Sequence, residues 1–216
     1  MTETDDESVW PAVLRLLDDA QTDVRVVSPD PERCRVALQQ LQLTERSTMG
    51  VIAARTGGLI VDSGWLRVLG GGSAGLPALA VSADDDPARS HLVIAHDAIG
   101  GRFAVDGGAL GVGPGEVCYW GPDTLAWSGI GGGYSAFIAW ALGGGLTDFY
   151  GSLRWKGWQD DTRPLRPDQG WALYPPPFAE QGQDTNAVSR AVVPLAELHE
   201  FYAEAARRFD GNAPTN

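Results

Sequence analysis

The sequence predicts an α+β fold, with a mixed, mainly antiparallel sheet flanked by N-terminal and C-terminal helices. Two observations carry this prediction. Apolar residues recur at helical spacing near both ends, in residues 9–20 and 194–209. Between them, residues 91–127 hold short apolar runs separated by glycine turns, the pattern of antiparallel strands. After the glycine-rich residues 70–75 no crossover helix and parallel strand are recognisable, so a dinucleotide-binding fold is not expected.

The N-terminal elements follow from spacing and from helix-capping residues. A helix is expected over residues 9–20 and a short strand over residues 24–27. Asp30 followed by Pro31 indicates a second helix, because a carboxylate caps the free amides and proline fits the first turn. That helix is expected to end near Leu41. Tight-turn residues then separate three β-rich runs, at residues 50–55, 59–62 and 65–69.

The middle of the chain alternates strands with turns. Residues 70–90 are glycine-rich and then acidic, which indicates a loop. Asp97 is expected to open the turn over residues 97–101, where its carboxylate can accept bonds from the following amides. Helices are expected over residues 134–142 and 146–153. The strands expected in this part are residues 91–95, 102–106, 116–120 and 125–127.

The C-terminal part is irregular and then helical. Prolines in residues 154–185 disfavour long regular structure, and this segment is expected to wrap over the sheet. The last helix, over residues 194–209, is expected to bury Leu195, Leu198, Tyr202, Ala205 and Phe209. Residues 8–209 are therefore expected to form a single α+β domain, with disordered tails at residues 1–7 and 210–216.

The net charge of the chain limits the kinds of partner that it is expected to bind. The formal net charge is −12, and lysine and arginine together number 16. Such an acidic chain is repelled by nucleic-acid phosphates and by anionic membrane surfaces, so neither partner is expected. It attracts a basic protein and accelerates that association. No run of 18 apolar residues is present, and the acidic N-terminus does not resemble a secretory signal, so a cytoplasmic location is expected.

Cysteine and histidine give no pattern of metal ligands. Cys34 and Cys118 have no second cysteine or histidine at ligand spacing, and both are expected to be reduced core thiols. His91 and His96 lie five residues apart on a strand, which predicts opposite faces of the sheet. No metal and no cofactor is expected.

Residues 71–75 read GGSAG, which matches the nucleophile elbow of serine hydrolases at Ser73. Asp168 and His199 follow in the order that these enzymes use. Pro77 comes four residues after Ser73, however, where an elbow requires a long helix. A small serine hydrolase using Ser73 is therefore one alternative, and no catalytic residue is assigned.

The eight tryptophans suggest a second alternative, a carbohydrate-binding module with aromatic platforms. Most tryptophans of a chain this size are core residues. Trp155 and Trp158 are the expected exceptions, because charged residues surround them. Mixed aromatic and charged surface is typical of interface hot spots.

Longer motifs carry a family resemblance. The runs TGGLIVDSGWLRVLGGGSAGLP, HDAIGGRFAVDGGALG, EVCYWGPDTLAW, FYGSLRWKGW and DQGWALYPPPF resemble a bacterial family of uncharacterised proteins, domain of unknown function 2625. The similarity extends over about residues 8–200. The resemblance implies no activity.

A shorter pattern resembles the SUKH superfamily, which includes immunity proteins against bacterial toxins and fungal cell-wall regulators. Asp97, Phe103, Tyr119, Trp127 and Trp140 carry it. This resemblance implies an α+β fold and a binding role without catalytic residues. We therefore expect an immunity-like, protein-binding domain whose partner is a basic protein such as a toxin domain. The residues expected to contact that partner are Asp84, Asp85, Asp86, Trp155, Trp158, Asp160 and Asp161.

Overall fold

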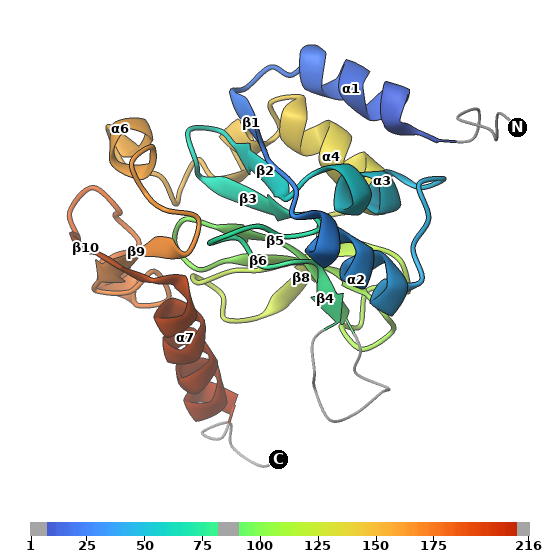
Figure 1. The fold of residues 1–216 in the computed structure, drawn as a ribbon. Coiled ribbons are helices and arrows are strands. Elements are labelled where there is room, and N and C mark those ends of the chain that lie inside the picture. The colour runs from blue at the N-terminus through green and yellow to red at the C-terminus, as the bar shows by residue number, and fades with distance from the viewer. Residues whose placement is uncertain (1–7, 82–90, 211–216) are drawn as a thin grey trace, which may run out of the picture.

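The computed structural model describes residues 8–81 and 91–210. The tails expected to be disordered, apart from residue 210, and the acidic part of the 70–90 loop lie outside these residues. Within them the fold is α+β, as predicted: an eight-stranded antiparallel sheet with helices at both ends of the chain (Figure 1). No helix among the described residues is long and apolar enough to cross a membrane.

The sheet has the strand order β1-β2-β3-β5-β6-β7-β8, and the two-residue β4 joins β5. Every pairing in it is antiparallel. A separate antiparallel pair is formed by β9 and β10. The strands are β1 Val24–Val27, β2 Gly58–Val61, β3 Leu66–Leu69, β4 Ala80–Val81, β5 His91–Asp97, β6 Arg102–Asp106, β7 Val117–Trp120, β8 Trp127–Gly129, β9 Gln169–Tyr174 and β10 Ser189–Pro194.

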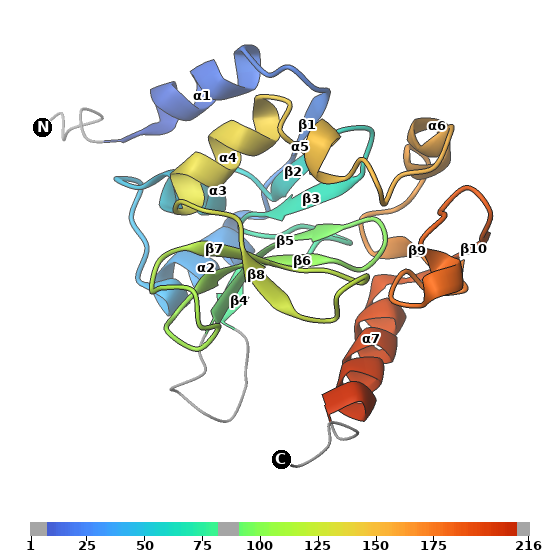
Figure 2. The same cartoon turned by 180° about the vertical axis from the view of Figure 1, so that it is seen from behind.

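The helices cover both faces of the sheet. On one face α1, α3 and α4 pack together (Figures 1 and 2), and Phe137 of α4 contacts Phe103 of β6. On the other face α7 packs with the β9–β10 pair, and its Tyr202 contacts Trp120 of β7. The helices are α1 Trp10–Asp18, α2 Pro31–Leu41, α3 Thr48–Arg55, α4 Tyr134–Leu142, α5 Leu146–Phe149, α6 Trp158–Thr162 and α7 Leu195–Asp210, with a 3-10 turn at Glu180–Gly182.

Helix α2 begins as the sequence predicts. The Asp30 carboxylate accepts hydrogen bonds from the amides of Glu32 and Arg33, and Pro31 occupies the first turn. Residues 50–55, expected to be a strand, instead belong to α3. The Ser47 hydroxyl accepts a bond from the amide of Gly50 and caps this helix. The β-branched residues that suggested a strand are buried inside a helix that packs against the sheet.

The segment expected to be irregular contains α6 and β9. Strand β9 pairs along its whole length with β10, from Gln169 opposite Pro194 to Tyr174 opposite Ser189. The sequence predicts neither β9 nor β10, because these two strands pair only with each other and a proline-rich loop separates them. We call β9, β10 and α7 the C-terminal unit.

Candidate functional site

A row of cationic and aromatic side chains crosses the sheet on the face that α7 covers. Residues that pair directly across antiparallel strands share a face. The register therefore aligns one residue from each of seven strands. In strand order these are Arg25, Ile60, Arg67, His96, Arg102, Trp120 and Trp127.

A β-bulge in β5 places His91 and His96 on this same face, so the expectation of opposite faces is wrong. His91 pairs with Asp106 and His96 pairs with Arg102, and these partners lie four residues apart on β6. The register shifts between Val93 and Ala95, so β5 holds one residue more than β6 between the two pairs. The extra residue reverses the alternation of side chains beyond it.

His96 and His199 face each other between the sheet and α7. Their ring centroids lie 4.9 Å apart, and both rings line a cavity of about 340 Å³. Burial lowers the pKa of His96 well below its usual value; a proton on His199 would lower it further, and the charges of Arg102 and Arg67 do so as well. Both rings are therefore neutral near neutral pH. Among the described residues no group of three or more His, Cys, Asp or Glu side chains is placed to hold a metal ion.

We expect His199 to make the protein less stable as the pH falls from about 7 to about 5. Burial, and then the charge of Arg102, lower the pKa of His199 to about 4. The unfolded chain binds a proton below about pH 6.5 that the folded state does not, so stability is full above that pH and falls below it. The loss at about pH 5 is about 2 kcal/mol.

Urea unfolding curves at the two pH values measure this loss in the wild type and in His199→Gln. The variant has no group that titrates at this position, so its stability should fall less over the same interval. An equal fall in both proteins would show that other groups cause the acid sensitivity.

Arg67 is buried at the centre of the row. It is 1% exposed, and neither of its terminal guanidinium nitrogens has a hydrogen-bond partner among the described residues. Burial lowers the pKa of Arg67 to about 10, against the opposing charge of Asp97, so it stays cationic at neutral pH. Arg67 lines a cavity of about 140 Å³ that Arg25 and Arg163 also line.

Asp97 is fully buried and faces the α4 side of the sheet. The hydroxyls of Tyr119 and Tyr150 donate to one carboxylate oxygen, over 2.8 Å and 3.0 Å. The amides of Ile99 and Gly101 donate to the other, as the predicted turn requires. Burial raises the pKa of Asp97, and these four hydrogen bonds oppose the rise. The sequence predicts the turn but not the two tyrosines.

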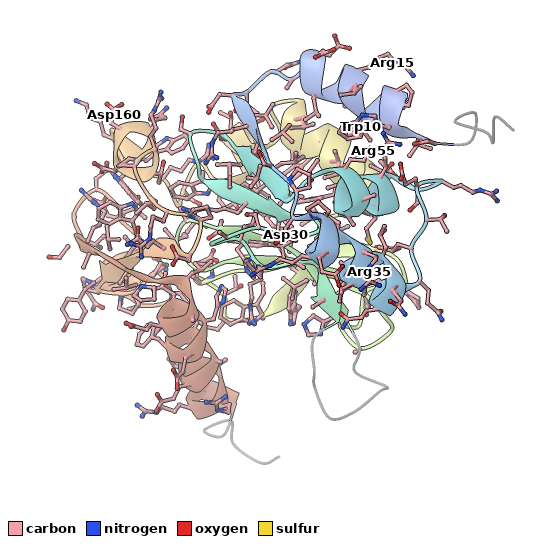
Figure 3. The ribbon with its side chains drawn as sticks, in the orientation of Figure 1. Trp10, Arg15, Asp30, Arg35, Arg55 and Asp160 are labelled. Carbon is pink, nitrogen blue, oxygen red and sulfur yellow. The ribbon has the colours of Figure 1, made fainter. Side chains whose placement is uncertain are left out.

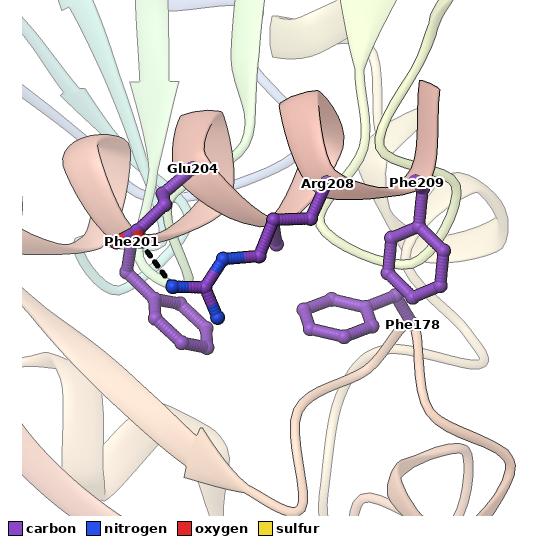
Figure 4. Close-up of a pocket in the computed structure, with 6 residues that line it drawn as sticks. Phe178, Phe201, Glu204, Arg208 and Phe209 are labelled. Atoms are coloured by element: carbon purple, nitrogen blue, oxygen red, sulfur yellow. Dashed lines mark hydrogen bonds and ion pairs between the residues drawn. The ribbon is translucent and has the colours of Figure 1, made fainter. Parts of the chain in front are cut away.

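A third feature is an apolar groove on the outer side of α7, with a volume of about 320 Å³. Figure 4 shows Phe178 facing Phe201, Arg208 and Phe209 on one side of the helix. The Phe178 ring centroid lies 6.1 Å from that of Phe201 and 5.7 Å from that of Phe209. Phe209, expected to be buried, is 61% exposed. We call Phe178, Phe201 and Phe209 the aromatic groove.

Trp155 and Trp158 lie in the core, so the expectation that they are exposed is wrong. They are 2% and 9% exposed and pack against Trp65. The cation beside them is buried as well: the Arg154 guanidinium lies 3.9 Å from the Trp158 ring centroid and pairs with Asp62. Arg154, one of the charged neighbours on which the expectation of exposure was based, therefore packs with these tryptophans in the interior.

Of the five acidic residues expected to contact a partner, the structure describes two, Asp160 and Asp161. Asp84, Asp85 and Asp86 lie outside the described residues. Asp161 is half-buried, and its carboxylate accepts the indole N–H of Trp155 over 2.6 Å. Asp160 is exposed on α6, on the opposite side of the molecule from the arginines labelled on α1, α2 and α3 (Figure 3). Asp160 thus remains available to a partner.

The serine hydrolase and the carbohydrate-binding module each require a local structure that the described residues do not form. Ser73 lies in a tight turn closed by its bridge to Leu76, and β4 follows where a nucleophile elbow requires a helix. His199 lies in α7 against His96. All eight tryptophans are described, and each is buried or half-buried, so none forms an exposed platform for a sugar.

Comparison with known proteins gives relatives without an assigned activity. Residues 1–198 match the family DUF2625, described as a protein of unknown function. The chain is 36% identical over 207 residues to the putative uncharacterized protein YbfG of Escherichia coli strain K12, with 94% of each chain covered. It is 33% identical over 177 residues to an uncharacterized protein of Haemophilus influenzae, with 79% of this chain and 78% of that one covered. No solved structure matches.

Proposed function

The chain belongs to the DUF2625 family, and from that premise we propose that it is a cytoplasmic, non-catalytic protein-binding domain whose partner docks on the aromatic groove of α7. The observation that supports this most is the position of its exposed apolar side chains. Seven large hydrophobic residues are exposed among the described residues, and four belong to the C-terminal unit. These four are Tyr174, Val192, Phe201 and Phe209.

The groove combines apolar surface with charge. Phe201, Glu204, Arg208 and Phe209 recur at helical spacing, so they form one stripe of α7. Arg208 donates to the Glu204 carboxylate, which holds the arginine along the groove between the rings. Exposed aromatic side chains beside an arginine are typical of interface hot spots.

The charge of the molecule supports a basic partner. The net charge is −12, and Glu197, Glu200 and Glu204 are exposed on α7. Such a surface raises the rate at which a basic protein associates. Asp160 of α6 adds an exposed carboxylate elsewhere on the molecule. In its most specific form, following the SUKH resemblance, the proposal names the partner as the basic active domain of a toxin.

Replacing Phe209 by alanine is expected to weaken partner binding at least about tenfold, because hot-spot aromatics contribute about 2 kcal/mol or more. The partner is first captured from native cells with the tagged wild type and identified by mass spectrometry. Its affinity is then measured with the purified proteins at low and high salt. Affinity should fall as salt rises, since exposed charges are screened.

Leu14→Ala is the matched control, because Leu14 is also an exposed apolar residue, 41% exposed, but lies on α1. Equal binding by Phe209→Ala and Leu14→Ala would place the partner elsewhere. Binding that does not change with salt would argue against a basic partner.

A further inference from the structure

A second site lies at the opposite edge of the sheet from β8, where three arginines surround one cavity. Arg25 of β1 and Arg67 of β3 flank Ile60 of β2 on the same face. Arg163 follows α6 and reaches the cavity from outside the sheet. The three guanidiniums thus come from segments far apart in the sequence, and the fold brings them together.

Arg163 lies beside a turn that several hydrogen bonds hold in place. Its guanidinium donates to the Ser63 hydroxyl over 3.4 Å. The Thr162 hydroxyl donates to the Ser63 carbonyl over 2.9 Å, which ties the end of α6 to the β2–β3 turn. Asp23 accepts the amide of Ser63 over 2.8 Å and its hydroxyl over 3.3 Å. The turn that carries Ser63 is therefore anchored on both sides of the cavity.

Arg67 is the observation that points to a ligand. It is almost completely buried and lines the cavity, yet its two terminal nitrogens have no hydrogen-bond partner in the part of the chain that the structure describes. Asp97 is the acid whose charge acts on it most, but both carboxylate oxygens of Asp97 accept bonds from other donors. A buried cation without partners is costly, and an anion in the cavity would satisfy it.

The charges that line the cavity indicate which anion fits. Three arginines and Asp23 leave a net charge of plus two, which a phosphate dianion neutralises and a single carboxylate does not. Guanidinium groups bind phosphate oxygens with paired, charge-assisted hydrogen bonds. The volume of about 140 Å³ accommodates a phosphate group with few further atoms. Arg25 and Arg163 are exposed, so the cavity is open to solvent at their side.

We propose that this chain binds a phosphate group between Arg25, Arg67 and Arg163. The site is independent of the aromatic groove on α7. Phosphate bound there would link β1, β3 and the segment after α6, and so would join the sheet to the chain that leads into the C-terminal unit. The bound group would stabilise the folded protein by an amount that grows with the logarithm of its concentration above the dissociation constant.

The test is calorimetric titration of the whole protein with inorganic phosphate in a buffer that contains chloride as its other anion. Wild type is expected to bind, and phosphate should raise its unfolding temperature. Arg163→Gln and Arg25→Gln should each weaken binding about tenfold or more, because each removes a charge-assisted contact. Arg67→Met should abolish binding. Arg166→Gln is the matched control, since Arg166 is exposed three residues from Arg163 but does not line the cavity.

Three results would overturn the proposal: no binding of phosphate at millimolar concentration, the same loss in Arg166→Gln as in Arg163→Gln, or acetate binding as tightly as phosphate. If Arg67→Met does not fold, the two variants of exposed arginines decide the question. Neither of them alters a buried residue.

Discussion

Replacing Asp97 by alanine is expected to lower the free energy of unfolding by about 4 kcal/mol. The carboxylate accepts four hydrogen bonds inside the protein, two from tyrosine hydroxyls and two from backbone amides. Alanine leaves these donors buried without an acceptor, and each such donor costs about 1–3 kcal/mol before neighbouring groups adjust. It also leaves Arg67 without the negative charge that acts on it most.

Urea denaturation of purified wild type and Asp97→Ala measures this change. Asp160→Ala is the control, because Asp160 is exposed on α6 and should change stability by less than about 1 kcal/mol. Tyr119→Phe removes one donor to Asp97 and should cost about 1 kcal/mol. If Asp97→Ala is no less stable than Tyr119→Phe, the four hydrogen bonds to this carboxylate do not stabilise the fold as expected.

Replacing Asp106 by alanine is expected to cost about 3 kcal/mol, for a related reason. Its carboxylate accepts five backbone amides of the loop that follows β6, from residues 108–113. These bonds take the place of regular secondary structure in that loop. Hydrogen bonds to a charged carboxylate are stronger than those between neutral groups. Alanine would leave the five amides of this loop without their acceptor.

The same carboxylate predicts a loss of stability in acid. Burial acts to raise the pKa of Asp106, but the amides of Leu110, Gly108, Gly113 and Val112 together lower it to about 2. A lowered pKa contributes stability that is present above the unfolded value of 3.8 and is lost as the pH falls toward 2. Asp106→Ala should lack this step in acid unfolding curves, while Glu116→Ala, an exposed acid near the same loop, should keep it. A step of equal size in both variants would contradict the assignment.

Local signals in the sequence predicted much of the fold. The start of α2 at Asp30 and Pro31 and the bounds of β6 follow from capping and alternation alone. The prediction of a strand at residues 50–55 is wrong, because Val51 and Ile52 favour β structure, while the residue that caps helix α3, Ser47, lies before that run. Strands β9 and β10 depend on each other across a proline-rich loop, and pairing over such a distance leaves no local pattern.

The candidate sites were less predictable than the fold. Arg25, Arg67 and His96 share a row through strand register, which one sequence does not encode in a readable way. Trp155 was expected at the surface because charged residues flank it, yet Asp161 accepts its N–H and the ring is buried. The exposed aromatic residues are Tyr174 of β9 and Phe201 and Phe209 of α7. Phe201 lies outside the apolar stripe of its helix, which is a signal that the sequence carries.

The bulge in β5 has a consequence for the lengths of related chains. Residues before and after Ile94 already pair with consecutive residues of β6, Ala104 and Phe103. A relative that lacks Ile94 would keep every pairing and every side chain on its present face, and would lose the packing of one isoleucine. A deletion elsewhere in the strand would shift the register and move polar side chains to the buried face of the sheet. Single-residue gaps among homologues should therefore gather at Ile94.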